Sequence, residues 1–194
     1  MAKKKKIEGF TQPMTSMDYF FSSDADSQPF IKAALRTAAV ETPIRHNESI
    51  TLIYIKSGRG RISINAGVHE LHRGVLMAIS DYQPYKITPE GGVLHYVECQ
   101  FPYLLFLYFM ANPYFRFRSP GFGAQPVYAD LDEKNAETVE RLMGYILVSH
   151  SKGRHGDREI LQIMEVFGFL IKFSGVEAAI DRSGAPASPL PEPD

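Results

Sequence analysis

Three side chains in the middle of the chain are of types that bind metal ions or polar small molecules. His46 and Glu48 precede a β-branched run, and Tyr85 follows a turn further along. Imidazole and carboxylate groups at such places suit iron, manganese or nickel. However, no second histidine stands two residues after His46, and no other histidine pair has a typical ligand spacing. We therefore expect no metal site and no cofactor.

Nucleophilic catalysis has no better support in the sequence. Cys99 is the single cysteine and lies in an apolar run, which is typical of a buried small hydrophobe. A Gly-x-Ser-x-Gly motif is absent, and Gly58-Arg59-Gly60 is not followed by a helix, as a phosphate-binding loop would be. One cysteine excludes an intramolecular disulfide and fits the reducing cytoplasm. We expect a cytoplasmic protein that is not an enzyme.

A strand expected over residues 93–101 presents two alternating faces. Tyr96 and Glu98 share one face with Leu94 and Gln100. If this face points inward, Glu98 is a buried carboxylate, which is costly unless it is paired. It would then require a polar or cationic ligand, or a nearby arginine. If the faces are swapped, Glu98 is a solvent residue; we favour the inward orientation.

Short strands separated by turns surround these residues. The runs 49–56 and 61–65 are expected to form a hairpin through Gly58 and Gly60. Strands this short and evenly spaced indicate a sandwich or a barrel. Further strands are expected over 68–71, 75–79, 85–88 and 93–101, separated by turns at 66–67, 80–84 and 89–92.

From Asp130 onward the apolar residues recur with the period of a helix. Two helices are expected, over about 131–151 and 157–174. Asp130 or Asp132 is a candidate N-cap for the first. Strands followed by helices predict an α+β fold that is mainly β.

The two ends of the chain differ from the middle. Residues 1–29 are expected to form a polar arm, and residues 176–194 a Pro-rich linker or tail. The formal net charge is −1, and Lys3–Lys6 supplies four of the basic residues, so the folded part is mildly acidic. It lacks the clustered positive charge that nucleic-acid binding requires. The longest apolar run is too short to span a membrane.

The segment from Arg45 to Phe101 resembles the N-terminal arabinose-binding and dimerisation domain of AraC-type transcription regulators. The resemblance extends over about residues 30–175 and implies a cupin-type double-stranded β-helix (jelly-roll) barrel followed by two C-terminal helices. Val75 and Tyr85 depart from the usual Asp and His of the family. The matching stretches are Arg45-His46, Leu52–Gly60, Leu71–Ile79 and Tyr82–Tyr85.

The resemblance implies an effector sensor whose DNA-binding helix-turn-helix half is missing from this chain. The effector would be a sugar or another polar metabolite. Two copies would form a homodimer through Phe167, Leu170 and Ile171 of the second helix, and DNA would be contacted only through the missing domain. The residues expected to bind the ligand are Tyr96 and Glu98, which fall where the family places sugar-contacting side chains, with His46, Tyr54 and Tyr85 as weaker candidates.

Two other hypotheses remain open. Many cupins are metal-dependent enzymes that use a His-x-His pair, a Glu and a later His, so a stand-alone isomerase or dioxygenase is the alternative function. Here Glu48 and Tyr85 stand at two of the histidine positions. A structural interaction module without any ligand is the third hypothesis, which a fully packed barrel interior would favour.

Overall fold

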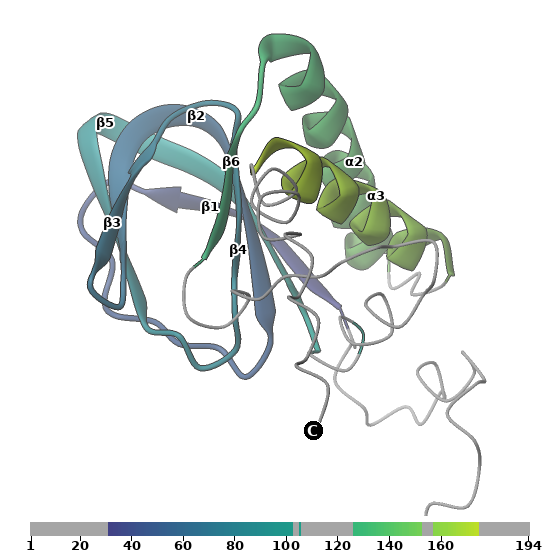
Figure 1. The fold of residues 1–194 in the computed structure, drawn as a ribbon, viewed down its shortest axis with the longest axis horizontal. Coiled ribbons are helices and arrows are strands. Elements are labelled where there is room, and N and C mark those ends of the chain that lie inside the picture. The colour runs from purple at the N-terminus through teal and green to yellow at the C-terminus, as the bar shows by residue number, and fades with distance from the viewer. Residues whose placement is uncertain (1–30, 103–104, 106–125, 153–156, 175–194) are drawn as a thin grey trace, which may run out of the picture.

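A computed structural model describes residues 31–102, 105, 126–152 and 157–174. The predicted arm 1–29 and tail 176–194 lie outside the described residues. The strands pair antiparallel, and two helices follow them, so the β-rich α+β prediction is confirmed (Figure 1). The elements are β1 (Lys32–Ala38), β2 (Ile50–Ile64), β3 (Gly67–Leu71), β4 (Val75–Ile79), β5 (Tyr85–Phe101), β6 (Val127–Asp130), α2 (Glu133–Ser151) and α3 (Asp157–Phe173).

The two longest strands, β2 and β5, pair along most of their lengths and bend together. The predicted hairpin at Gly58 and Gly60 and the predicted turn at 89–92 are therefore wrong, because the chain continues in the same strand through both. The register of β2 against β5 shifts on both sides of Ser57. Gly58 has φ +91°, and a Cβ there would lie 2.5 Å from the Val93 carbonyl oxygen. Glycine thus permits a bulge and a close approach instead of a reversal.

The bends divide the strands into two half-sheets. The first contains β1, the C-terminal half of β5, the N-terminal half of β2, β4 and β6. The second contains the N-terminal half of β5, the C-terminal half of β2 and β3, and an Arg45–Tyr85 bridge adds the preceding segment to it. The hairpin that does form joins β2 to β3 at the predicted turn, with Asn65 at φ 52°.

Each face of the first half-sheet covers its own apolar core. The inner face packs on the second half-sheet, and the side chains between them include Ile53, Ile55, Ile62, Ile87 and Tyr96. These side chains form the apolar core between the two half-sheets. The outer face packs under α2 and α3, which lie side by side along it (Figure 1).

An N-cap stabilises the start of α2, and an aromatic contact packs α3 on the outer face. Asp132 caps α2 by accepting from the Asn135 backbone N–H at 2.9 Å. In α3, Phe167 meets Phe101 of β5 edge-to-face, with ring centroids 5.7 Å apart. None of the helices in the described part of the chain is long and apolar enough to cross a membrane.

The apolar stripe predicted for dimerisation is occupied within the chain itself. Phe167 is 1% exposed and Leu170 is fully buried in the core beneath the helices. Ile171 is partly buried against the same core. In this structure the apolar stripe of α3 faces the sheet, so the Phe167 and Leu170 side chains are not exposed for contact with a second molecule.

Candidate functional site

Alternation along β5 places Tyr96 and Glu98 on its inner face. Tyr96 belongs to the core between the half-sheets, whereas Val97 and Cys99 belong to the core beneath the helices. Glu98 is only 4% exposed. The inward orientation of Glu98 is thus the one that the structure adopts. A carboxylate at this depth requires partners.

Two arginines from separate segments supply those partners. Arg45, in the segment before β2, places Nη1 3.4 Å from Glu98 Oε2. Arg36 of β1 places Nη2 3.6 Å from Glu98 Oε1. The Gln100 amide donates to the same Oε1 at 2.9 Å. Of the options that the sequence left open, a nearby arginine is the one found, and it is found twice.

A hydrogen-bonded group of neutral side chains adjoins the charged one. Asn47 Nδ2 donates to Thr51 Oγ1 at 2.8 Å and to the Tyr85 hydroxyl at 3.3 Å. Arg45 Nη1 lies 3.5 Å from the Tyr96 hydroxyl. Burial, reinforced by the Glu98 charge, raises the pKa of Tyr85 to about 12. Burial also raises the pKa of Tyr96, although Arg45 opposes the shift. Both phenols therefore keep their protons at neutral pH.

These groups line a cleft of ≈ 350 Å³ at the edge where β1, the 44–47 segment and β5 meet. It brings together three of the predicted residues, His46, Tyr85 and Glu98, and Tyr96 adjoins them through Arg45. The lining is mostly polar, and we name it the arginine cleft. Its residues are Arg36, Ile44, Arg45, His46, Asn47, Tyr85, Glu98 and Gln100.

Tyr54 is the predicted site residue that the structure does not bring to the arginine cleft. It lies on the outer face of β2, in the core beneath the helices. Its hydroxyl donates to the Ala136 carbonyl of α2 at 2.9 Å. Tyr54 therefore does not share a site with the other four predicted residues. Neighbouring residues of a strand face opposite ways, and Tyr54 lies on the face that packs under the helices.

Sequence reasoning missed Arg36 and Asn47 as site residues. Arg36 reaches Glu98 because β1 pairs with β5 in the register that sets Arg36 opposite Tyr96. That long-range pairing leaves no local signal. Arg45 did carry a signal, because it stands in the Arg45-His46 stretch on which the family resemblance depends.

The donor set of the arginine cleft does not fit a metal ion. Both Glu98 oxygens already face guanidinium groups, and one also accepts from an amide. Among the described residues, no group of three or more His, Cys, Asp or Glu side chains is placed to hold a metal. The arginine cleft instead offers hydrogen-bond donors, which surround the Glu98 carboxylate and neutralise its charge.

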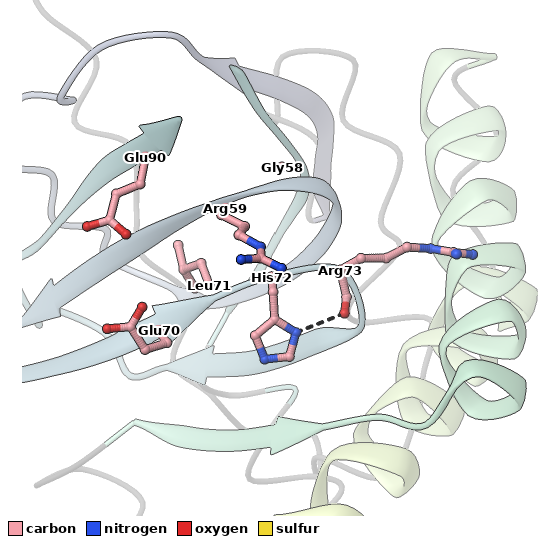
Figure 2. A pocket seen from close by; sticks show the side chains of 7 residues that line it. All are labelled: Gly58, Arg59, Glu70, Leu71, His72, Arg73 and Glu90. Atoms are coloured by element: carbon pink, nitrogen blue, oxygen red, sulfur yellow. Dashed lines mark hydrogen bonds between the residues drawn. The ribbon is translucent and has the colours of Figure 1, made fainter. Parts of the chain in front are cut away.

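A second cleft, of ≈ 690 Å³, lies near the bend of β2 and the end of β3. Figure 2 shows that the Arg73 side chain points away from the other lining residues, toward α2. Glu90, in turn, forms an ion pair with Arg61 at 2.5 Å, and His72 Nε2 lies 3.4 Å from Asp130. These charged side chains lie on a solvated sheet surface, where each ion pair contributes little to the stability of the fold.

A third cleft, of ≈ 410 Å³, runs along the outer side of α3. Its lining is predominantly apolar, and Leu161 within it is 60% exposed. Met164 and Phe169 of this lining also pack partly against the core beneath the helices. We name this lining the outer α3 face, and its residues are Leu161, Met164, Glu165, Gly168, Phe169 and Lys172.

Comparisons with solved structures find partial likeness to several proteins, a cupin superfamily protein among them. A cupin superfamily protein from Desulfitobacterium hafniense is 13% identical, with a TM-score of 0.37 over 39% of this chain and 71% of that chain. Salicylate 1,2-dioxygenase from Pseudaminobacter salicylatoxidans is 18% identical, with a TM-score of 0.35 over 37% of this chain and 21% of that chain. A conserved protein of unknown function from Streptococcus pyogenes is 10% identical, with a TM-score of 0.36 over 39% of this chain and 68% of that chain.

No family model and no curated protein matches the sequence. Likenesses this partial do not establish a family. The architecture described above therefore stands on the pairing of the strands themselves, with two bent strands folded over a shared core and two helices behind one half-sheet.

Proposed function

We propose that this chain is a cupin-type effector-binding domain of an AraC-like transcription regulator, and that the arginine cleft is its ligand site. The observation that carries the proposal is Glu98, a buried carboxylate held between Arg36 and Arg45 at the wall of a polar cleft. Convergent polar groups in a concave site are typical of small-molecule binding. The resemblance over residues 45–101 supplies the class of protein.

The effector signal would reach DNA through a domain outside this chain, and the protein would act in the cytoplasm. β5 offers a direct route for the signal, because Glu98 contacts the cleft and the adjacent Cys99 packs beneath the helices. A ligand can shift such a system only by binding two arrangements with different affinity.

A thermal-shift screen against sugars, small acids and amines tests the ligand site. A ligand at 100 times its Kd adds about 2.7 kcal/mol, which for a chain of this size raises Tm by about 5–10 °C. We expect Tyr85→Phe or Arg36→Gln to reduce the shift, and Arg59→Gln in the second cleft to leave it unchanged. A ligand whose shift survives the first two substitutions but not the third would move the site to the second cleft.

The same purified protein tests the enzyme alternative. Elemental analysis that finds a stoichiometric transition metal, lost in His46→Ala, would favour a metal-dependent cupin enzyme and overturn the sensor proposal. We expect no metal to be retained, because the Glu98 oxygens already face cationic and amide donors.

We also propose that the protein is a homodimer through the outer α3 face. Glu165 and Lys172 carry opposite charges. Along α3 they lie equally far from the midpoint between Gly168 and Phe169. In an antiparallel pair of α3 helices centred there, each Glu165 would face the Lys172 of the other copy. A two-fold interface requires such self-complementarity, and Gly168 allows the helices to approach closely.

Sedimentation velocity tests the dimer. We expect the full chain to be dimeric and Leu161→Glu to be monomeric, because the substitution puts two charges into the apolar contact. Val148→Glu, at an exposed position of α2, is the matched control and is expected to remain dimeric. A dimer that resists Leu161→Glu would exclude this face.

A further inference from the structure

The arginine cleft holds more positive than negative charge. Arg36 and Arg45 face a single carboxylate, Glu98, so the described charged groups sum to one excess cation. A guanidinium has five N–H donors in a planar fork. One carboxylate cannot occupy the donors of two such groups.

The geometry of the two ion pairs leaves room for a further acceptor. Charge-assisted N–H···O bonds are typically about 2.7–2.9 Å long, whereas the Arg45 and Arg36 nitrogens lie 3.4 Å and 3.6 Å from the Glu98 oxygens. The two side chains also remain accessible, with Arg36 47% and Arg45 34% exposed. Glu98 therefore anchors the arginines loosely, and their remaining N–H groups face the cleft.

Tyr85, a neutral residue of the lining, adds a hydroxyl donor to the cleft. Asn47 donates to the Tyr85 oxygen at 3.3 Å, which leaves the phenol proton directed elsewhere. The one ionised acceptor of the cleft, Glu98, is already engaged by Gln100 as well as by the arginines. The one carboxylate of the cleft is thus already engaged, whereas an anionic oxygen group would meet two partly exposed guanidinium groups.

We propose that the ligand of the arginine cleft is a small organic acid whose carboxylate binds Arg36 and Arg45 beside Glu98. This inference rests on the proposed function, because it names the ligand class of the same cleft. A cleft of ≈ 350 Å³ lies at the small end of the range for ligand sites, about 300–1,000 Å³. It suits a metabolite of the size of a monosaccharide acid.

Titration of the isotope-labelled protein with sodium formate, followed through the arginine Nε–H resonances, tests the ligand class. Sodium chloride is exchanged for formate at constant ionic strength. We expect saturable shifts at Arg36 and Arg45 and only a small linear drift at Arg59, which is a matched control in the same spectrum. Methylammonium chloride is expected to produce no saturable shift at any of the three.

The outcomes separate the ligand class from the site. A saturable response at Arg59 equal to that at Arg45, or no saturable response to formate at all, overturns the carboxylate proposal. If D-glucose shifts Arg36 and Arg45 while formate does not, the class is wrong and the cleft remains the ligand site. If a thermal-shift ligand perturbs neither arginine, the proposed function of the cleft fails as well. Because the measurements use the unsubstituted protein, none depends on a variant folding.

Discussion

Removing both arginines while keeping Glu98 should destabilise the fold strongly. The Arg36→Gln/Arg45→Gln variant leaves a carboxylate that is 4% exposed with the Gln100 amide as its remaining described partner. Leaving a buried charge without its counter-charge typically costs about 3–5 kcal/mol. Because Gln100 still donates and water can enter the cleft, we expect about 3 kcal/mol, at the lower end of that range.

Neutralising the carboxylate in the same background should recover most of the loss. Adding Glu98→Gln removes the buried charge and keeps an acceptor for Gln100, so we expect about 2 kcal/mol to return. Urea denaturation followed by far-ultraviolet circular dichroism measures each step, since the chain has no tryptophan to report unfolding. A triple variant no more stable than the double one would refute charge burial as the source of the loss.

A surface pair provides the control for this cycle. Arg61 is 51% exposed and pairs with Glu90, which is 40% exposed. Exposed ion pairs contribute less than about 1 kcal/mol. The Arg59→Gln/Arg61→Gln variant removes the same number of positive charges and is expected to lose no more than that.

Three further predictions follow from single contacts. Tyr54→Phe deletes the hydrogen bond to Ala136, so we expect denaturation to show a loss of about 1 kcal/mol with ligand affinity unchanged. Gly58→Ala should lower the free energy of unfolding by about 2 kcal/mol and Gly91→Ala by about 1 kcal/mol in the same assay. Both glycines have positive φ, but only Gly58 lies against the β5 backbone. Burial raises the pKa of Tyr54 and Tyr85 to about 12, so the folded state keeps protons that the unfolded chain releases near pH 10. Stability should be intact below pH 10 and fall as the pH rises toward 12, and Tyr85→Phe should flatten the fall.

Local periodicity predicted the parts of the fold that depend on local physics. The alternation around Glu98 placed Tyr96 and Glu98 on one face of the strand, and the change of period after Asp130 identified both helices. The cost of burying Glu98 predicted either a polar or cationic ligand or a nearby arginine, and the structure places Arg36 and Arg45 beside it. These inferences succeed because a strand or helix exposes its pattern within a few residues.

Long-range pairing decided what the sequence could not predict. Gly58 and Gly60 are equally compatible with a reversal and with a bulge, and the pairing of β2 with β5 selects the bulge. Arg36 joins the site only through the register of β1 on β5. The helical pattern predicts that Phe167 packs against another apolar surface, but it does not say which one. In the structure that surface is the sheet, through Phe101.

The strand β5 connects the candidate site with the helices because its two faces serve different cores. Glu98 points into the arginine cleft, while Cys99 and Phe101 point under α3, where Phe101 contacts Phe167. Packed cores resist small displacements of a strand, since interiors are as dense as organic crystals. A ligand that draws Arg36 and Arg45 together would therefore act on β5 through Glu98, and the Phe101–Phe167 contact is one place where a shift of the strand would reach α3. On this argument the outer α3 face would respond to the ligand although it lies on the far side of the sheet from the cleft.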